Sequence, residues 1–183
     1  MSDPRRLHIG GMVRAPGWEV FNITAGAHVD HVGNANDLSR FEEGSFAAVY
    51  ASHTLEHFDY RGELERTLKE WARVLLPGGT LYVSVPDLET LAKLLLVKED
   101  LTTDDRFMVM RMVFGGHVDA HDYHLVGLDE EFLGIFLTRA GFVDLRRVRS
   151  FGLFQDTSEL LFKGIPISLN VVGTKAQAGA TGK

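Results

Sequence analysis

Residues 45–87 read SFAAVYASHTLEHFDYRGELERTLKEWARVLLPGGTLYVSVPD. Segment 46–51 is a short run of apolar and β-forming residues, which is typical of a strand buried on both faces. Segment 64–76 changes to helical spacing, with its apolar side chains on one face. The Pro-Gly-Gly triplet at 77–79 predicts a helix stop and a turn, and the apolar segment 81–85 predicts a second strand. Two buried strands joined through a helix form a βαβ unit, which predicts a parallel sheet.

The pattern SF-x-x-VYASHTLEHF, followed by LKEWARVLLPGGTLYVSVPD, resembles the second half of a class I S-adenosylmethionine-dependent methyltransferase of the "methyltransferase type 11" group. In that group a strand ends in a Leu-Glu-His loop, and a later helix ends in R-V-L-x-P-G-G. The resemblance implies an α/β fold with a doubly wound, mostly parallel Rossmann-like sheet and a C-terminal antiparallel strand pair. It also implies an enzyme that uses S-adenosylmethionine as its cofactor.

Composition favours one soluble domain over residues 1–175, with a small, polar tail at 176–183 that we expect to be disordered. The 183 residues include no cysteine, so disulfides and thiolate metal sites are excluded. A net charge of -6 argues against a general nucleic-acid surface, and no apolar run reaches the length of a membrane span. We therefore expect a cytoplasmic protein with neither nucleic-acid nor membrane partners.

The other expected elements complete the same sheet. Three short strands are expected before the quoted stretch, at 6–9, 19–23 and 27–32. After it we expect helices at 88–97 and from 129 to 141, and strands at 143–149 and 167–174. The first crossover is too short for the usual helix, and a brief helix is expected within 34–39. A Met- and Phe-rich segment at 106–114 has helical spacing and makes a homodimer plausible.

Ligands of such sheets bind outside the carboxyl ends of the strands. The resemblance places seven residues around the cofactor: Gly10, Gly11, Asn22, Asn34, Ala35, His53 and Leu55. The glycine-rich motif is shortened and degenerate, because only a Gly-Gly pair follows the first strand. Asn22 and Asn34 stand where the family carries acids, so charge-assisted hydrogen bonds to the cofactor are lost. An ordinary set of turns explains the Gly-Gly pair and Asn34 equally well.

The H-x-x-E-H spacing of His53, Glu56 and His57 puts these side chains on one face if the turn is helical, a geometry that suits a divalent metal. The alternative is that His53 lines the cofactor pocket while Glu56 caps a turn. These three residues are therefore minor metal candidates, and no metal is the leading expectation.

Residues 115–124 read GGHVDAHDYH, and this segment forms the roof over the methyl donor in the resembled family. A histidine there can take a proton from an attacking hydroxyl or amine. His124 and Tyr123 are the first candidates for catalysis, and His57 joins them from the preceding loop. The segment is otherwise a surface loop, or a source of metal ligands through His117, His121 and Asp122.

The resulting hypothesis is methyl transfer to an oxygen or nitrogen of a small-molecule acceptor, with a saccharide or a secondary metabolite as its class. One alternative is a catalytically silent domain that acts as a binding or scaffold protein, since acids are missing near His8, Asn22, Asn34 and Ala47. The other is a metal-dependent enzyme that uses the His-rich loop.

Overall fold

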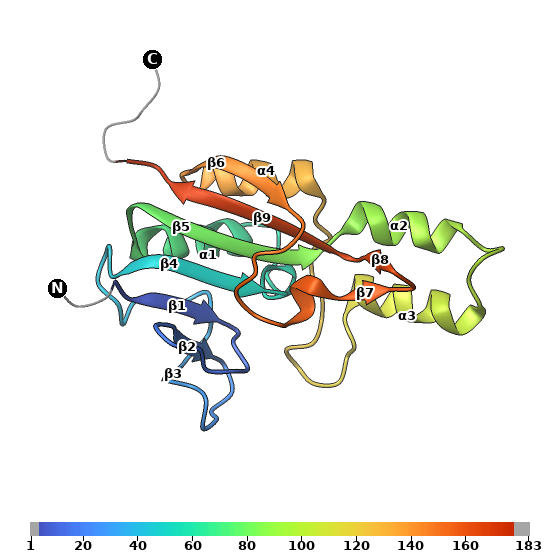
Figure 1. The fold of residues 1–183 in the computed structure, drawn as a ribbon, viewed down its shortest axis with the longest axis horizontal. Helices are drawn as coiled ribbons and strands as arrows, with labels where there is room; N and C mark the ends of the chain where they lie inside the picture. The colour runs from blue at the N-terminus through green and yellow to red at the C-terminus, as the bar shows by residue number, and fades with distance from the viewer. Residues whose placement is uncertain (1–3, 178–183) are drawn as a thin grey trace, which may run out of the picture.

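The computed structural model describes residues 4–177. One sheet of seven strands runs in the order β3-β2-β1-β4-β5-β9-β6 (Figure 1). Its strands are β1 (Arg6–Ile9), β2 (Glu19–Asn22), β3 (His31–Val32), β4 (Phe46–Ser52), β5 (Leu75–Pro86), β6 (Phe142–Val148) and β9 (Ser168–Lys175). All neighbours pair in parallel except β9, which is antiparallel to both β5 and β6. This confirms the predicted fold class. Residues 178–183 of the predicted tail lie outside the described residues.

Four α-helices accompany the sheet. They are α1 (Glu63–Val74), α2 (Leu88–Leu96), α3 (Thr103–Phe114) and α4 (Glu130–Arg139). The 3₁₀ turns η1 (Leu55–His57) and η2 (Thr157–Glu159) and the small hairpin of β7 (Leu161–Phe162) and β8 (Ile165–Pro166) complete the elements. Helices α2 and α3 pack on each other beyond the carboxyl end of β5 (Figure 1). Within residues 4–177, no helix combines the length and the apolar character needed to cross a bilayer.

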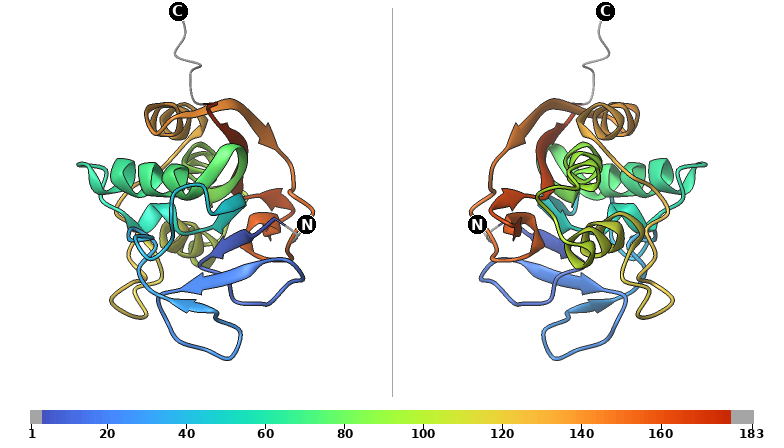
Figure 2. Two further views of the ribbon diagram at one scale, coloured as in Figure 1. Left: turned by 90° about the vertical axis from the view of Figure 1, so that its left-hand side faces the viewer. Right: turned by 90° about the vertical axis from the view of Figure 1, so that its right-hand side faces the viewer.

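Helices α1 and α4 cover one face of the sheet (Figure 2). The apolar face of α1 buries Leu64, Leu68 and Trp71 completely, and Leu133 of α4 joins the same core. Burying a side chain of this size stabilises the fold by about 1.5–3 kcal/mol. The indole N–H of Trp71 donates to the Ala35 carbonyl at 2.8 Å, so α1 also anchors the loop between β3 and β4.

The opposite face is covered by the segment between β6 and β7 (Figure 2). Phe154 packs against His8, Trp18 and Tyr50, with ring centroids 4.1–5.3 Å apart. The Tyr50 hydroxyl donates to the Asp156 carboxylate at 2.7 Å. No helix lies between β1 and β2 or between β2 and β3 in the part of the chain that is described, so this C-terminal segment shields the sheet there.

The predicted turn at 77–79 is wrong. Helix α1 ends at Val74, and β5 begins at once with Leu75 and runs through the Pro-Gly-Gly triplet. The register with β4 shifts between Phe46 and Ala48, so the triplet is an irregularity inside the strand. A glycine is required at Gly79, because a Cβ there would lie 2.8 Å from the Leu76 carbonyl oxygen.

Two local predictions fail, whereas the helix predicted for the Met- and Phe-rich segment is confirmed. The third strand is only the two residues of β3, and segment 34–39 forms turns without the expected helix. The Met- and Phe-rich segment lies in α3 as expected, but Phe107 and Phe114 are more than half exposed. Local propensity marks these segments correctly as structured, but tertiary pairing decides how far each element extends.

The carboxyl ends of β1, β2, β4 and β5 meet at one edge of the sheet, since these strands are parallel. The loops that follow them and the segment between α3 and α4 lie beyond that edge (Figure 1).

Candidate functional site

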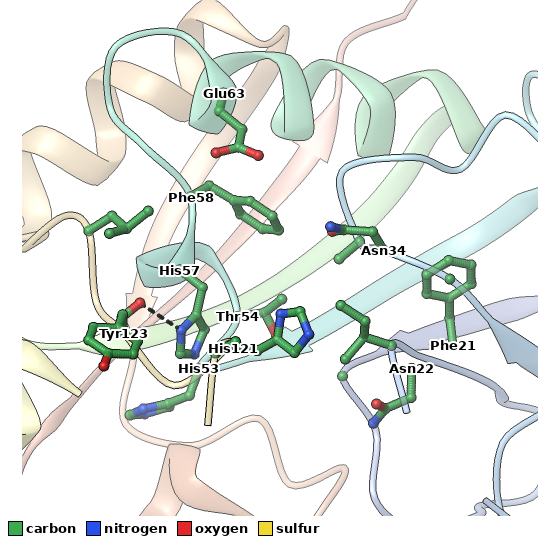
Figure 3. A pocket seen from close by; sticks show the side chains of 16 residues that line it. Phe21, Asn22, Asn34, His53, Thr54, His57, Phe58, Glu63, His121 and Tyr123 are labelled. Atoms are coloured by element: carbon green, nitrogen blue, oxygen red, sulfur yellow. Dashed lines mark hydrogen bonds between the residues drawn. The ribbon is translucent and has the colours of Figure 1, made fainter. Parts of the chain in front are cut away.

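A cavity of about 500 Å³, called here the first cavity, lies outside the carboxyl ends of β1, β2 and β4. Its walls come from the strand ends, the loop after β3, the start of α1 and the loop before α4 (Figure 3). The lining residues are Gly10, Phe21, Asn22, Ile23, Gly33, Asn34, Ala35, His53, Thr54, His57, Phe58, Glu63, Ala120, His121, Tyr123 and Leu125.

The predicted cofactor residues divide into two groups. Five of them line the first cavity, namely Gly10, Asn22, Asn34, Ala35 and His53. The other two do not line it. Gly11 is buried, and Leu55 is completely buried in the hydrophobic core. The role of the five lining residues in cofactor binding stays a prediction.

Asn22 at the end of β2 holds two turns together. Its side-chain amide donates to the Gly11 carbonyl at 3.0 Å, and its side-chain oxygen accepts from the Thr24 amide at 2.9 Å. A carboxylate at position 22 could not donate to the Gly11 carbonyl, so this hydrogen bond gives a structural reason for asparagine rather than aspartate at this position. The oxygen keeps one lone pair for a ligand in the cavity.

Gly10 closes the turn after β1 with a φ of +73°, a conformation that L-residues other than glycine rarely adopt. A Cβ at this position would lie 2.8 Å from Thr54 Oγ1. The backbone of the turn is therefore open to the cavity where a side chain would obstruct it.

The far wall is built on the loop after β3. The Asn34 side-chain oxygen accepts from the Asn36 amide at 3.2 Å, which forms an Asx turn. The Asn36 side chain donates to Glu63 Oε1 at 2.9 Å, and the Asp59 amide donates to Glu63 Oε2 at 3.1 Å. Glu63 therefore places a carboxylate over the cavity, a feature that sequence reasoning missed because the residue reads as an ordinary helix start.

A second cavity of about 310 Å³ adjoins the first and shares His53 with it. Helix α3 supplies Met108, Arg111 and Met112 to its wall, and the loop after α3 supplies Asp122 and His124. The backbone of His53 has a φ of +50°, which turns the chain sharply after β4. His53 is therefore the residue that separates the two spaces.

Glu56 lies behind this junction and is 1% exposed. Neither carboxylate oxygen has a hydrogen-bond partner among residues 4–177. His53 Nδ1 lies 3.4 Å from Glu56 Oε1, and His124 Nε2 lies 4.0 Å from the same atom. The rings of His57 and His124 meet edge to face, with centroids 5.0 Å apart. We refer to Glu56, His53, His57 and His124 as the histidine–glutamate cluster.

Burial sets the protonation of this cluster. It raises the pKa of Glu56 to about 8, since a charged carboxylate loses its hydration there. Burial also lowers the pKa of His53 to about 4, and the neighbouring His124 adds to this shift. The pKa of His124 is lowered by burial and by His57. At neutral pH the carboxyl group therefore keeps its proton, while His53 and His124 are neutral bases.

The predicted catalytic residues come together only in part. His57 and Tyr123 line the first cavity, whereas His124 lines the second. The Tyr123 carbonyl oxygen lies 3.1 Å from His57 Nδ1 (Figure 3). The Tyr123 ring stacks on His117 with centroids 4.1 Å apart, so its backbone is the part that contacts the cluster.

Of the minor metal candidates, Glu56 and His57 converge with each other and with His124 from a distant loop. Of this group, His53 contacts Glu56 alone, with Nδ1 3.4 Å from Oε1. The other set considered, with His117 and Asp122, does not converge in the described chain. His117 Nε2 lies 2.8 Å from the Phe114 carbonyl oxygen, on the exposed side of the loop.

The comparisons agree with this geometry. Residues 20–83 match the family model described as Methyltransferase domain. A SAM-dependent methyltransferase from Archaeoglobus fulgidus superposes with a TM-score of 0.61 at 15% identity, over 94% of this chain and 87% of its own. A SAM-dependent methyltransferase from Methanosarcina mazei superposes with a TM-score of 0.58 at 18% identity, over 97% of this chain and 94% of its own. The CurJ carbon methyltransferase superposes with a TM-score of 0.56 at 16% identity, over 95% of this chain but only 49% of its own. This chain therefore spans about half the length of that protein.

At these identities the solved structures show the fold. The family match includes the ends of β2 and β4, the loop after β3 and the start of α1, but neither the turn after β1 nor the loop before α4. The chain therefore has the fold of the S-adenosylmethionine-dependent methyltransferases with which it superposes, and its residues 20–83 are similar to the methyltransferase family model.

Proposed function

We propose that the first cavity binds S-adenosylmethionine and that an oxygen or nitrogen of a small polar metabolite, held in the second cavity, receives the methyl group. The observation that carries this proposal is the pair of adjoining cavities with His53 between them. Donor and acceptor must meet in line for methyl transfer, and two cavities with one shared wall allow such a meeting.

The residues of the first cavity suit this cofactor. Its volume of about 500 Å³ falls within the usual range for small-ligand sites. The backbone at Gly10, which carries no side chain, allows the methionine part of S-adenosylmethionine to approach closely. The free lone pair of Asn22 suits a ribose hydroxyl, and Asn34 with Ala35 suits the adenine. The cofactor supplies an electrophilic methyl group on a sulfonium centre.

The second cavity combines apolar and polar walls. Met108, Met112 and Ile167 provide apolar contact, while Arg111 and Asp122 offer a hydrogen-bond donor and acceptor. This lining suits a hydroxylated acceptor such as a saccharide or a secondary metabolite.

The acceptor must lose a proton when its oxygen or nitrogen gains the methyl group. The electron pair of the acceptor forms the new bond to carbon, and the pair of the broken carbon–sulfur bond stays on sulfur. The histidine–glutamate cluster lies at the junction of the two cavities, and we assign to it the task of promoting this proton loss. His57 and His124 thus keep the catalytic roles predicted from the sequence, and Tyr123 orients His57 through its carbonyl.

Two matched variants of α3 test the assignment of the cavities. Met108 lines the second cavity, whereas Phe107 is 59% exposed and does not. Met108→Trp should fill the acceptor site and abolish transfer of a labelled methyl group to fractionated small metabolites. It should leave the affinity for S-adenosylhomocysteine within about 2-fold of wild type, because the first cavity is untouched.

Phe107→Trp should change neither property. Equal methyl transfer by both variants would contradict the acceptor assignment. Transfer of label only into macromolecules would contradict the small-metabolite class.

A further inference from the structure

The feature of the molecule that methyl transfer alone leaves unexplained is the Glu56 carboxylate. It is 1% exposed, and both of its oxygens lack hydrogen-bond partners within the described chain. Nitrogens of His53 and His124 lie 3.4 and 4.0 Å from Oε1, and one of His57 lies within 4.8 Å of a carboxylate oxygen. An unpartnered buried carboxyl group costs about 1–3 kcal/mol or more, so a fold that retains one needs a compensating partner.

Each of the three histidines has one ring nitrogen already engaged. His57 Nδ1 lies 3.1 Å from the Tyr123 carbonyl oxygen, and His124 Nδ1 lies 3.1 Å from the Met112 carbonyl oxygen. A carbonyl can only accept, so both Nδ1 atoms carry hydrogen and both Nε2 atoms are unprotonated in the neutral rings.

The hydrogen bonds of His53 determine its tautomer in the same way. Its Nε2 lies 2.9 Å from Ser168 Oγ, and that hydroxyl donates its one hydrogen to the Thr157 carbonyl at 2.9 Å. Ser168 therefore accepts from His53 Nε2–H, which leaves His53 Nδ1 unprotonated and facing Glu56 at 3.4 Å. Backbone or hydroxyl groups that hold the outer nitrogen of an imidazole are the usual support of metal-binding histidines.

The inner atoms also have the spacing of a ligand set. One ligand atom each from Glu56, His57 and His124 lies within 4.8 Å of the others. Tetrahedral ligands about 2.0–2.2 Å from a zinc ion are about 3.4 Å apart. Glu56 Oε1 lies 4.0 Å from His124 Nε2 of this set and 3.4 Å from Nδ1 of His53, and both distances are close to this value.

We propose that Glu56, His57 and His124, with His53 as a further ligand, bind a divalent first-row transition-metal ion of the zinc class. Imidazole and carboxylate together favour such an ion over Mg²⁺ or Ca²⁺, which prefer all-oxygen sites. Glu56 loses its proton to solvent when the ion binds, and the ion is then the charge partner of the buried carboxylate.

The site is reached from both cavities, since His57 lines the first, His124 the second and His53 both. A metal ion there lowers the pKa of an acceptor hydroxyl that binds to it, and the proton leaves to solvent water. This role rests on the proposed methyl transfer, whereas the binding of the ion does not.

The test is a metal titration of purified, chelator-treated protein with Zn²⁺ against a chromophoric competitor, with Mg²⁺ as a comparison. We expect one Zn²⁺ per chain with a dissociation constant below about 1 µM and no competition by Mg²⁺. Glu56→Gln and His124→Gln should each weaken Zn²⁺ binding by about 100-fold or more.

His53 and His117 provide a matched control pair, because both have positive φ, at +50° and +55°, and asparagine tolerates this conformation best after glycine. His53→Asn should weaken Zn²⁺ binding by about 10-fold or more. His117→Asn should leave it unchanged. Co²⁺ bound to the wild type should show visible absorption that Glu56→Gln and His124→Gln lose.

No binding of Zn²⁺ at about 100 µM, or equal affinity in wild type, Glu56→Gln and His124→Gln, would overturn the proposal. S-adenosylhomocysteine binding, measured separately on metal-free protein, keeps the two hypotheses distinct. Zn²⁺ binding without cofactor binding would contradict the proposed function and leave the metal site standing.

Discussion

Gly10 and Gly17 allow the cofactor site to be tested with two variants of equal backbone strain. Their φ angles are +73° and +76°, so alanine at either position costs about 1–2 kcal/mol of left-handed strain. Alanine also reduces the conformational entropy of the unfolded chain, which offsets about 0.4–1 kcal/mol of this cost. The net decrease in the free energy of unfolding is then about 1 kcal/mol. For a chain of this size that loss lowers Tm by about 2–4 °C.

The two positions differ in what the new methyl group meets. At Gly10 it lies 2.8 Å from Thr54 Oγ1 on the wall of the first cavity, and at Gly17 it meets no atom within 4 Å. We expect Gly10→Ala to weaken S-adenosylhomocysteine binding by about 10-fold or more, or ~1.4 kcal/mol, by calorimetry. Gly17→Ala should stay within about 2-fold of wild type. Equal affinities at similar Tm would refute the placement of the cofactor at this turn.

Three further predictions concern stability. Burial lowers the pKa of His8 from 6.5 to about 4. Between these two pH values His8 is therefore protonated in the unfolded state but neutral in the folded state. Wild-type stability should therefore fall by up to about 3 kcal/mol from pH 6.5 to pH 4, and His8→Phe should show a smaller fall in urea unfolding. Asn22→Asp places a carboxylate against the Gly11 carbonyl, and at pH 8 it should cost about 1–3 kcal/mol in the same assay; an unchanged midpoint would show that the amide hydrogen bond is unimportant. Thr102→Ala removes half of a capping box with Asp105 at the start of α3 and should cost about 1 kcal/mol by thermal unfolding, with no change expected in cofactor affinity.

The fold could be predicted from the sequence because its central unit follows local rules. The sequence periodicity of each segment is compatible with one type of element. The apolar runs predict the strands β4 and β5, and the amphipathic spacing predicts the helix α1. The Pro-Gly-Gly triplet misled the prediction because its residue types favour a turn, whereas pairing with β4 and β9 extends β5 through it. Pairing across the sheet is not visible in a local window.

The candidate site could be predicted only where topology alone determines it. Gly10, Asn22, Asn34 and His53 line one cavity because parallel strands end at one edge. The orphaned carboxylate of Glu56 depends on packing between distant segments. The backbone amide of Leu125 donates to the Glu56 carbonyl at 2.7 Å and so brings the loop before α4 against η1. No spacing in the sequence indicates that contact.

The central claim is that the first cavity holds the methyl donor despite amides in place of acids. Calorimetric titration of the purified protein with S-adenosylhomocysteine tests it most directly. We expect one site per chain with a dissociation constant in the micromolar range, which corresponds to about -8 kcal/mol at 1 µM. No heat of binding at millimolar ligand, from protein that unfolds cooperatively, would contradict it.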